Sequence, residues 1–119
     1  MPNYLTISTS IDLINIPLWE IVFVVADGNY SSITTQGGDT LLSALQLGQI
    51  EQMLEQGDGD TLFARIGKSL IVNISCIRYI NIPKLKIVLH DRMAHTYQQQ
   101  ASREALKQLK KYMEAEYGK

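Results

Sequence analysis

The sequence predicts a mainly β protein, built of antiparallel sheets with one short internal helix and one C-terminal helix. Three observations support this class. Short runs of β-branched and aromatic residues recur along the chain, which is typical of strands. Turn-forming residues such as Asp27-Gly28-Asn29 separate neighbouring runs by a few positions, so consecutive strands are expected to pair as hairpins. Apolar residues repeat at helical spacing over 46–56 and after Ser102.

The N-terminal strands follow from alternation and from apolar runs. Residues 4–8 alternate, and apolar residues continue to Ile16 before Pro17 interrupts, as at a turn or a sheet edge. The continuous run 21–25 predicts a strand buried on both faces. After the turn at Asn29, residues 30–35 should return as the second strand of a hairpin. Gly37-Gly38 turns the chain again, and 39–44 is a candidate further strand.

The middle of the chain combines a helix, a loop and two strands. Four apolar residues predict a short amphipathic helix over 46–56; they are Leu47, Ile50, Met53 and Leu54. The acidic, glycine-rich segment 57–60 should end this helix and form a loop. Residues 67–69, Gly-Lys-Ser, are expected to form an exposed turn that leads into a buried strand. We expect this strand, 70–74, to pair with 77–82.

Two further strands and a helix follow. Pro83-Lys84 turns the chain into the alternating run 85–89, and a turn at 90–92 precedes a polar returning strand at 93–99. Ser102 is a suitable N-cap for the last helix, and Glu104 favours the positive end of the helix dipole. The apolar stripe of this helix consists of Leu106, Leu109, Met113 and Tyr117, with Gly118 at its end.

Length and composition limit the class of protein. At 119 residues and 45% hydrophobic, the chain is expected to form one domain, 1–119. No apolar run approaches the roughly 18–20 residues of a membrane span, and the N-terminus lacks the pattern of a secretory signal. Cys76 lies in an apolar run and is expected to be a small buried side chain in a reducing compartment. These features predict a cytoplasmic protein with no membrane partner.

Charge is distributed unevenly along the chain. The first sixty residues contain eight of the twelve acidic residues and no Lys or Arg. The rest contains four acidic residues and all eleven basic ones, so the two parts carry −8 and +7 within a total of −1. Such an asymmetry favours a polyanionic partner.

Patterns that would indicate catalysis or a cofactor are incomplete. The segment 67–69 resembles the end of a phosphate-binding P-loop, but Leu62 stands where that motif needs its first glycine. A calcium loop that opens at 58–60 would have Ser69 in place of its closing carboxylate. The two histidines and the one cysteine lie in different segments, which disfavours a zinc site or a nucleophile–base pair. We therefore expect no enzyme activity, no metal and no cofactor.

Basic side chains are the remaining functional candidates. Arg103, Lys107 and Lys110 fall on the face of the last helix opposite its apolar stripe, and a solvated surface is the ordinary explanation of such a run. Further basic residues lie in or near turns of the same half, and basic side chains on loops suit phosphate contact and base readout. These further residues are Arg65, Lys68, Lys86 and Arg92.

Four segments together resemble a known family. Residues 24–31 read Val-Val-Ala-Asp-Gly-Asn-Tyr-Ser, a threonine- and leucine-containing segment follows at 40–54, residues 63–73 read Phe-Ala-Arg-Ile-Gly-Lys-Ser-Leu-Ile-Val-Asn, and Ser102-Arg103 leads into a leucine-rich helix. In this order the segments resemble the LytTR domain, the DNA-binding module of many bacterial response regulators. The resemblance covers about 4–111.

The resemblance implies an elongated stack of small antiparallel sheets whose loops, rather than a recognition helix, enter successive major grooves of double-stranded DNA. The residues that would read bases are Asn29, Tyr30, Ser31, Lys68 and Arg103. Those expected to contact phosphate are Ser69, Lys86 and Gln99, and Lys107 is added to them from the basic face of the last helix. Arg65 and Asn73 should instead fix the 67–69 turn by internal hydrogen bonds, and Phe63, Ile66 and Val72 should be core.

The sequence also departs from the family pattern. Gly67 stands where the family usually has His, and Lys68 where it often has Arg, which removes a planar fork of donors. Val25 replaces the usual Glu, and Glu104 places a carboxylate beside Arg103. The sequence contains no receiver domain, so phosphorylation-driven dimerisation is not expected within this chain.

The function implied is a stand-alone transcriptional regulator that binds repeated half-sites, with DNA bending and with a homodimer or a LytTR-family partner. The main alternative is a protein-interaction module that restrains another LytTR regulator without itself binding DNA. A small-molecule sensor built on the same sheets ranks next, and an enzyme ranks last.

Overall fold

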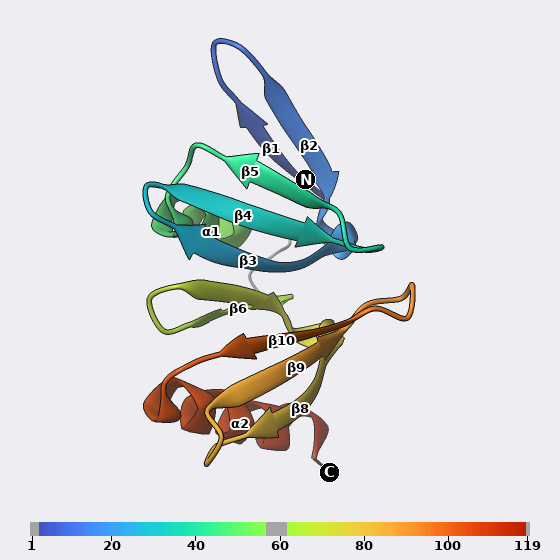
Figure 1. The fold of residues 1–119 in the computed structure, drawn as a ribbon, viewed down its shortest axis with the longest axis vertical. Helices are drawn as coiled ribbons and strands as arrows, with labels where there is room; N and C mark the ends of the chain where they lie inside the picture. Colours follow the sequence, from blue (N-terminus) through green and yellow to red (C-terminus); the bar gives the residue numbers. More distant parts are fainter. Residues whose placement is uncertain (1–2, 57–61, 119) are drawn as a thin grey trace.

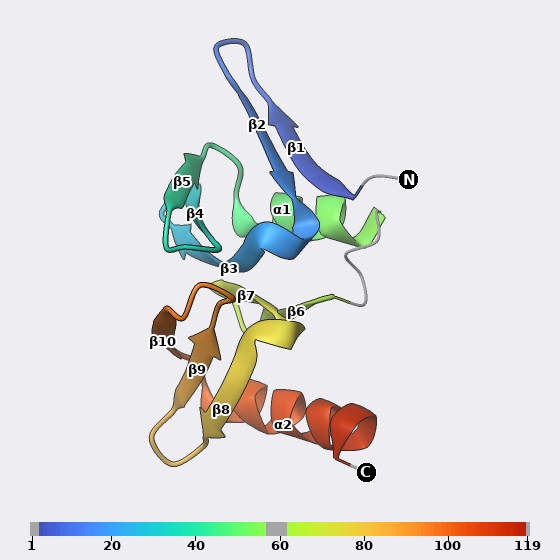
Figure 2. The same cartoon turned by 90° about the vertical axis from the view of Figure 1, so that its right-hand side faces the viewer.

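The computed structural model describes residues 3–56 and 62–118, and within these ranges the chain forms three antiparallel sheets and two α-helices. The layers are stacked along the longest axis of a molecule that measures 44 × 30 × 27 Å (Figures 1 and 2). The predicted class is therefore confirmed: the protein is mainly β, elongated and layered. The segment 57–60, with the loop and the rejected calcium site predicted there, lies outside the described residues.

The first layer is a hairpin at one end of the molecule. Strand β1 (Tyr4–Ser8) pairs with β2 (Leu13–Pro17), and the hairpin projects from the body in both views (Figures 1 and 2). The alternation in β1 is expressed directly, because Leu5 and Ile7 are buried while their neighbours are exposed. A short 3-10 turn, Leu18–Glu20, connects β2 to the central sheet.

The central layer is a five-stranded sheet in the order β5-β4-β3-β7-β6. Its strands are β3 (Ile21–Asp27), β4 (Tyr30–Thr35), β5 (Thr40–Ser43), β6 (Phe63–Ile66) and β7 (Leu70–Asn73). The middle strand, β3, is buried on both faces, as predicted. A bulge between Ile21 and Phe23 shifts the register of this strand. As a result, Val22 and Phe23 lie in the hydrophobic cluster on one face of the sheet, and Ile21 and Val24 lie in the cluster on the other face.

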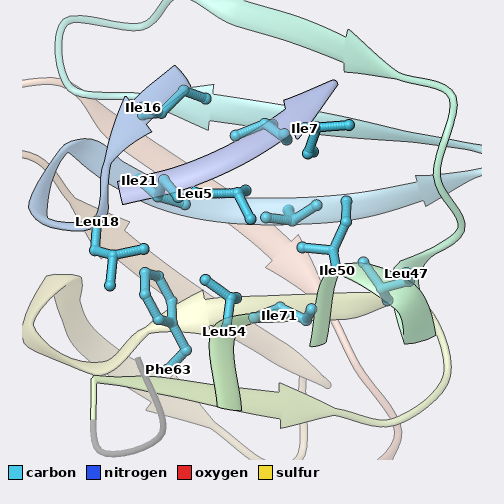
Figure 3. Close-up of a cluster of buried hydrophobic side chains, with 12 residues drawn as sticks. Leu5, Ile7, Ile16, Leu18, Ile21, Leu47, Ile50, Leu54, Phe63 and Ile71 are labelled. Carbon is cyan, nitrogen blue, oxygen red and sulfur yellow. The ribbon is translucent and has the colours of Figure 1, made fainter. Parts of the chain in front are cut away.

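Two hydrophobic clusters lie on the two faces of this sheet. The upper cluster joins the hairpin and the central sheet to helix α1 (Leu47–Gln56), as Figure 3 shows for Leu5, Leu47 and Ile50. The lower cluster joins the sheet to helix α2 (Arg103–Tyr117) and to the third sheet, with Leu106 and Leu109 among its members. Within the described ranges, neither helix is long and apolar enough to cross a membrane.

The third layer is a three-stranded sheet in the order β10-β9-β8. Its strands are β8 (Ile77–Asn81), β9 (Lys86–His90) and β10 (Thr96–Gln100). Helix α2 begins where predicted, because the Ser102 hydroxyl accepts a hydrogen bond from Ala105 N at 3.2 Å.

One predicted strand pairing is wrong. The strand after the 67–69 turn does not pair with 77–82; β7 pairs with β3 and with β6, a strand that the sequence pattern did not reveal. A 3-10 turn, Ile74–Cys76, separates β7 from β8 and directs them into different sheets. Asn73 stabilises this change of direction, because its Oδ1 accepts a hydrogen bond from Ser75 N while its Nδ2 donates to Ile21 O.

A second difference concerns the start of the returning strand. Strand β10 begins at Thr96 rather than at Met93. The carboxylate of Asp91 accepts hydrogen bonds from Met93 N and His95 N at 2.8 and 2.9 Å, and these hold the intervening residues as a loop.

Candidate nucleic-acid interface

Three loops lie on the same side of the elongated molecule. They are the β3–β4 turn, the β6–β7 turn and the N-terminal end of α2, and all three lie on the left of Figure 1, one below another. The arrangement follows from strand pairing, because both turns close short antiparallel hairpins of one sheet in the same direction. These loops, called the loop edge below, contain most of the residues that the sequence predicted to contact DNA.

Contacts connect neighbouring members of the loop edge. Ala26 N, at the end of β3, donates a hydrogen bond of 2.9 Å to Ser69 O in the β6–β7 turn. A Cβ at position 67 would lie 4.0 Å from that of Ala105 in the first turn of α2. Ala101 N, just before α2, donates to Leu85 O in the β8–β9 turn at 3.2 Å. The loops are therefore held in fixed relative positions.

The β3–β4 turn exposes two of its three candidate residues. Gly28 adopts a φ of +63°, a conformation that favours glycine and closes the turn tightly. Asn29 is exposed, and Tyr30 is 51% exposed. Ser31 is fully buried, and its hydroxyl donates a hydrogen bond of 2.8 Å to Leu45 O. The predicted base contact by Ser31 is therefore wrong: this side chain fixes the connection between β5 and α1.

Arg65 organises the β6–β7 turn from within. Its Nε donates to Gly67 O and its NH2 group to Lys68 O, both at 2.9 Å. Its NH1 group forms a 2.6 Å ion pair with Glu51 on α1. The predicted internal role of Arg65 is confirmed, and its consequence is that Lys68 and Ser69 stay exposed at the tip of a fixed turn. The bonds of Asn73 hold the exit from β7 rather than this turn.

The N-terminal end of α2 presents basic side chains one helical turn apart. Arg103 and Lys107 are both exposed, and positions i and i+4 lie on the same face of a helix. Lys110 differs, because its ammonium pairs with Glu114 at 2.9 Å. Glu104 is also exposed beside Arg103, so the local charge is mixed.

The third sheet separates two residues that were predicted to act alike. Gln99 lies opposite Ile87, which is fully buried, whereas Lys86 lies opposite Gln100. Because successive residues of a strand point to opposite faces, Lys86 and Gln99 lie on different faces of the sheet. The Lys86 ammonium lies 5.7 Å from the ring centroid of Tyr79. The structure thus does not bring this pair together.

The sequence reasoning missed one exposed basic residue beside the loop edge and misplaced another. Lys84 is exposed in the β8–β9 turn, which contacts the start of α2 through Leu85 O. Its signal was present in the sequence as a basic residue within a turn between strands. Arg92 lies at the opposite end of β9, and its guanidinium lies 5.1 Å from the ring centroid of Trp19.

A buried carboxylate lies away from the loop edge. The Asp91 side chain accepts hydrogen bonds from Gly37 N, in the β4–β5 turn of the central sheet, at 3.1 Å and from the Tyr97 hydroxyl at 2.8 Å. Burial would raise the pKa of Asp91, but the hydrogen bonds from His95, Tyr97, Gly37 and Met93 outweigh it and lower the pKa to about 2. Asp91 therefore fastens the central sheet to the third sheet as a carboxylate.

Groups that could support other chemistry are few. Among residues 3–56 and 62–118, no three His, Cys, Asp or Glu side chains gather as a metal site would require. Cys76 is buried, and burial raises the pKa of its thiol, which disfavours the reactive thiolate. The described loop edge exposes basic, amide and hydroxyl side chains, the groups that contact phosphates and base edges, together with the carboxylates of Asp27 and Glu104.

Comparison with known proteins adds two findings. The family described as the LytTr DNA-binding domain matches residues 12–114. The fold is similar to that of a solved LytTr DNA-binding domain from Bacillus cereus, described as part of a methyl-accepting/DNA response regulator. The TM-score is 0.67 at 18% sequence identity, and the match covers 95% of this chain and 98% of that chain. Among curated proteins, none matches this sequence.

Proposed function

Because this chain belongs to the LytTR family of DNA-binding domains, we propose that it regulates transcription by reading double-stranded DNA with its loop edge. The observation that carries the proposal is the placement of three exposed loop tips on one side of a molecule 44 Å long. The three tips lie one below another along the long axis (Figure 1), so a molecule that lies along the duplex would present all three to the same side of the DNA.

The proposed base contacts divide among the three loops. Arg103 can donate two parallel hydrogen bonds to guanine, and Lys68 can donate to the same acceptors from a single ammonium. Asn29 has both an amide donor and an acceptor, which suits adenine. Tyr30 would lie beside it. Ser31 is left out because it is buried.

The proposed phosphate contacts lie around these tips. Ser69 and Lys107 are exposed next to Lys68 and Arg103, and Lys84 is added from the structure. Lys86 and Gln99 lie on different faces of the third sheet. A single duplex could therefore not contact both side chains in the same way. As candidate phosphate contacts, we place Lys86 and Gln99 below Lys84 and Lys107.

Selection from a random duplex library tests the proposal directly. An enriched sequence motif is expected. Loss of this motif on Arg103→Ala would show that the loop edge is the surface that reads bases. A library that yields no motif, from protein that is folded by circular dichroism, would refute sequence-specific readout. A motif made of two copies would support repeated half-sites.

The alternative is a module that binds another LytTR regulator and does not bind DNA. The exposed carboxylates of Asp27 and Glu104, beside the first and third tips, favour it because they would repel phosphate. Salt dependence discriminates between the two functions, since each neutralised phosphate adds about −0.9 to the slope of log affinity against log salt. A slope near zero on a fixed duplex would favour the protein partner. Action as a stand-alone regulator, without a receiver domain, stays a prediction.

A further inference from the structure

The two outer strands of the central sheet differ in how their free edges are protected. At one edge, β6 includes the charged Arg65 and contacts helix α2. At the other edge, β5 reads Thr-Leu-Leu-Ser, and Leu41 and Leu42 are 41% and 58% exposed. Natural sheets usually protect an edge with Lys, Pro, a bulge or a covering segment. Strand β5 has no Lys, no Pro and no register shift, and among the described residues no strand pairs with its outer side.

The outer side of β5 offers backbone donors and acceptors. Thr35 N donates to Asp39 O at 2.8 Å, and this bond fixes which pairs of the β4–β5 ladder are hydrogen-bonded. Hydrogen-bonded and non-hydrogen-bonded pairs alternate along an antiparallel ladder. Counting from this bond, Thr40 and Leu42 direct their N–H and C=O groups away from β4. An extended segment can therefore pair with these groups and add a sixth strand to the sheet.

An apolar groove of about 380 Å³ lies between this edge and the β1–β2 hairpin. The hairpin extends above β5 in both views (Figures 1 and 2). The central sheet lines the groove with Leu42 and Tyr30, and the hairpin lines it with Ile7, Ile11 and Ile14. Alternate side chains of a strand point to the same face. A strand added to β5 can therefore place apolar side chains in the groove while its other side chains stay in solvent.

The charges around the groove are negative and lack basic partners. The first sixty residues contain eight acidic residues and no Lys or Arg. Asp12 lines the groove, and its carboxylate accepts a 2.6 Å hydrogen bond from the uncharged Thr9 hydroxyl, so its charge is not neutralised. Asp39 is exposed directly before β5, and Asp27 is exposed in the turn that leads to Tyr30. Within residues 3–56, Glu51 alone among the acidic side chains forms an ion pair with a basic one.

We propose that β5 binds an extended, basic segment of a partner protein, which adds to the central sheet as a sixth strand and inserts apolar side chains beside Leu42. The negative charges select this occupant. A second copy that paired β5 with β5 would bring together two acidic segments without a basic residue, which like-charge repulsion opposes. The same carboxylates repel DNA. A strand that alternates apolar residues with Lys or Arg instead matches the groove, the edge and the charge.

Selection of short random peptides displayed on phage, against the full chain without DNA, tests this contact independently of DNA binding. Enriched peptides are expected to alternate apolar residues with Lys or Arg. The affinity of the most enriched peptide, measured by fluorescence anisotropy, should fall about tenfold or more on Leu42→Lys, because this change places a cation in the groove. Met93→Lys is the matched control, since Met93 is 63% exposed and does not line the groove.

Backbone pairing has its own measurement. The bound peptide should slow hydrogen exchange at the amides of Thr40 and Leu42, and N-methylation of alternate peptide residues should abolish binding, because it removes the donors of the added strand. Selection that enriches no peptide on folded protein would overturn the proposal. Enrichment of acidic peptides, or binding that survives Leu42→Lys, would also overturn it. A dimer of the free protein that Leu42→Lys dissociates would assign the edge to a second copy instead.

Discussion

Two loops that contain basic residues, the β6–β7 turn and the β9–β10 loop, differ in which charged side chain is directed inward. In the β6–β7 turn, Arg65 points inward to the carbonyls of residues 67 and 68, and Lys68 stays exposed at the tip. In the β9–β10 loop, the carboxylate of Asp91 points inward, and the guanidinium of Arg92 lies over the Trp19 ring. The comparison teaches that a basic residue in a turn does not by itself identify a DNA contact. Whether a basic residue can contact DNA depends on whether its turn lies on the loop edge.

The largest expected effect is on stability, in the β9–β10 loop. Asp91→Ala should lower the free energy of unfolding by about 3 kcal/mol, because it leaves buried donors such as Gly37 N and the Tyr97 hydroxyl without an acceptor. Urea unfolding measures this change in the free energy of unfolding. Asp39→Ala, at an exposed carboxylate, is the control and should change stability by less than about 0.5 kcal/mol. DNA affinity of the folded Asp91 variant should stay unchanged, and a specific loss of affinity would contradict the separation of the two loops.

The same carboxylate should make stability depend on pH. The folded pKa of Asp91 is about 2, below the roughly 3.9 of an unfolded chain, so ionised Asp91 stabilises the fold above about pH 4. This contribution of about 2–3 kcal/mol should be lost progressively as the pH falls from about 5 through the folded pKa of about 2. Urea titrations across this range check it, with Asp91→Asn as the comparison. A wild-type pH dependence equal to that of Asp91→Asn would contradict the assignment.

On the loop edge, Arg103→Ala should cost about 1–3 kcal/mol of binding to the selected DNA site and relax the preference at one position. The reason is the loss of a bidentate contact to guanine. Fluorescence anisotropy with matched and mismatched duplexes measures both effects. Arg92→Ala removes the same charge from the β9–β10 loop, outside the loop edge, and should leave affinity nearly unchanged. Equal losses in the two variants would indicate a general charge effect and no defined reading side.

Arg65→Lys probes the internal support of the β6–β7 turn. Lysine keeps the charge but lacks the planar fork that reaches both carbonyls and Glu51. Binding should weaken by about 1 kcal/mol because Lys68 is less fixed, while Lys68→Ala in the same background should add little. Full additivity of the two changes in a double-mutant cycle would show that Arg65 does not act through Lys68.

Lys107→Ala should have the smallest effect. A phosphate contact carries no sequence information, so binding should weaken alike on all duplexes, and the salt slope should fall in magnitude by about 0.9. Lys110→Ala is the matched control one helical turn on, because its ammonium already pairs with Glu114. A change of sequence preference on Lys107→Ala would move this residue to the base-reading group.

Local chemistry by itself determined much of this fold. The β-branched run 21–25, the glycine turn at Gly28, the N-cap at Ser102 and the apolar spacing of α1 were all readable, because each depends on neighbours within a few positions. The same holds for the family, whose motifs are short contiguous segments. Whether residues 1–119 form one domain stays a prediction.

Tertiary structure alone decided how these elements combine. The sequence does not show that Val24 lies opposite Ile71, since that pairing joins distant segments and depends on which strand best covers β3. This pairing aligns the β3–β4 and β6–β7 turns and places β6 at the edge of the central sheet. Tertiary structure also decided which predicted side chains are available for binding. The Ser31 hydroxyl is buried against Leu45 O, and the Arg92 guanidinium lies over the Trp19 ring. Both surroundings are formed by segments that are distant in the sequence.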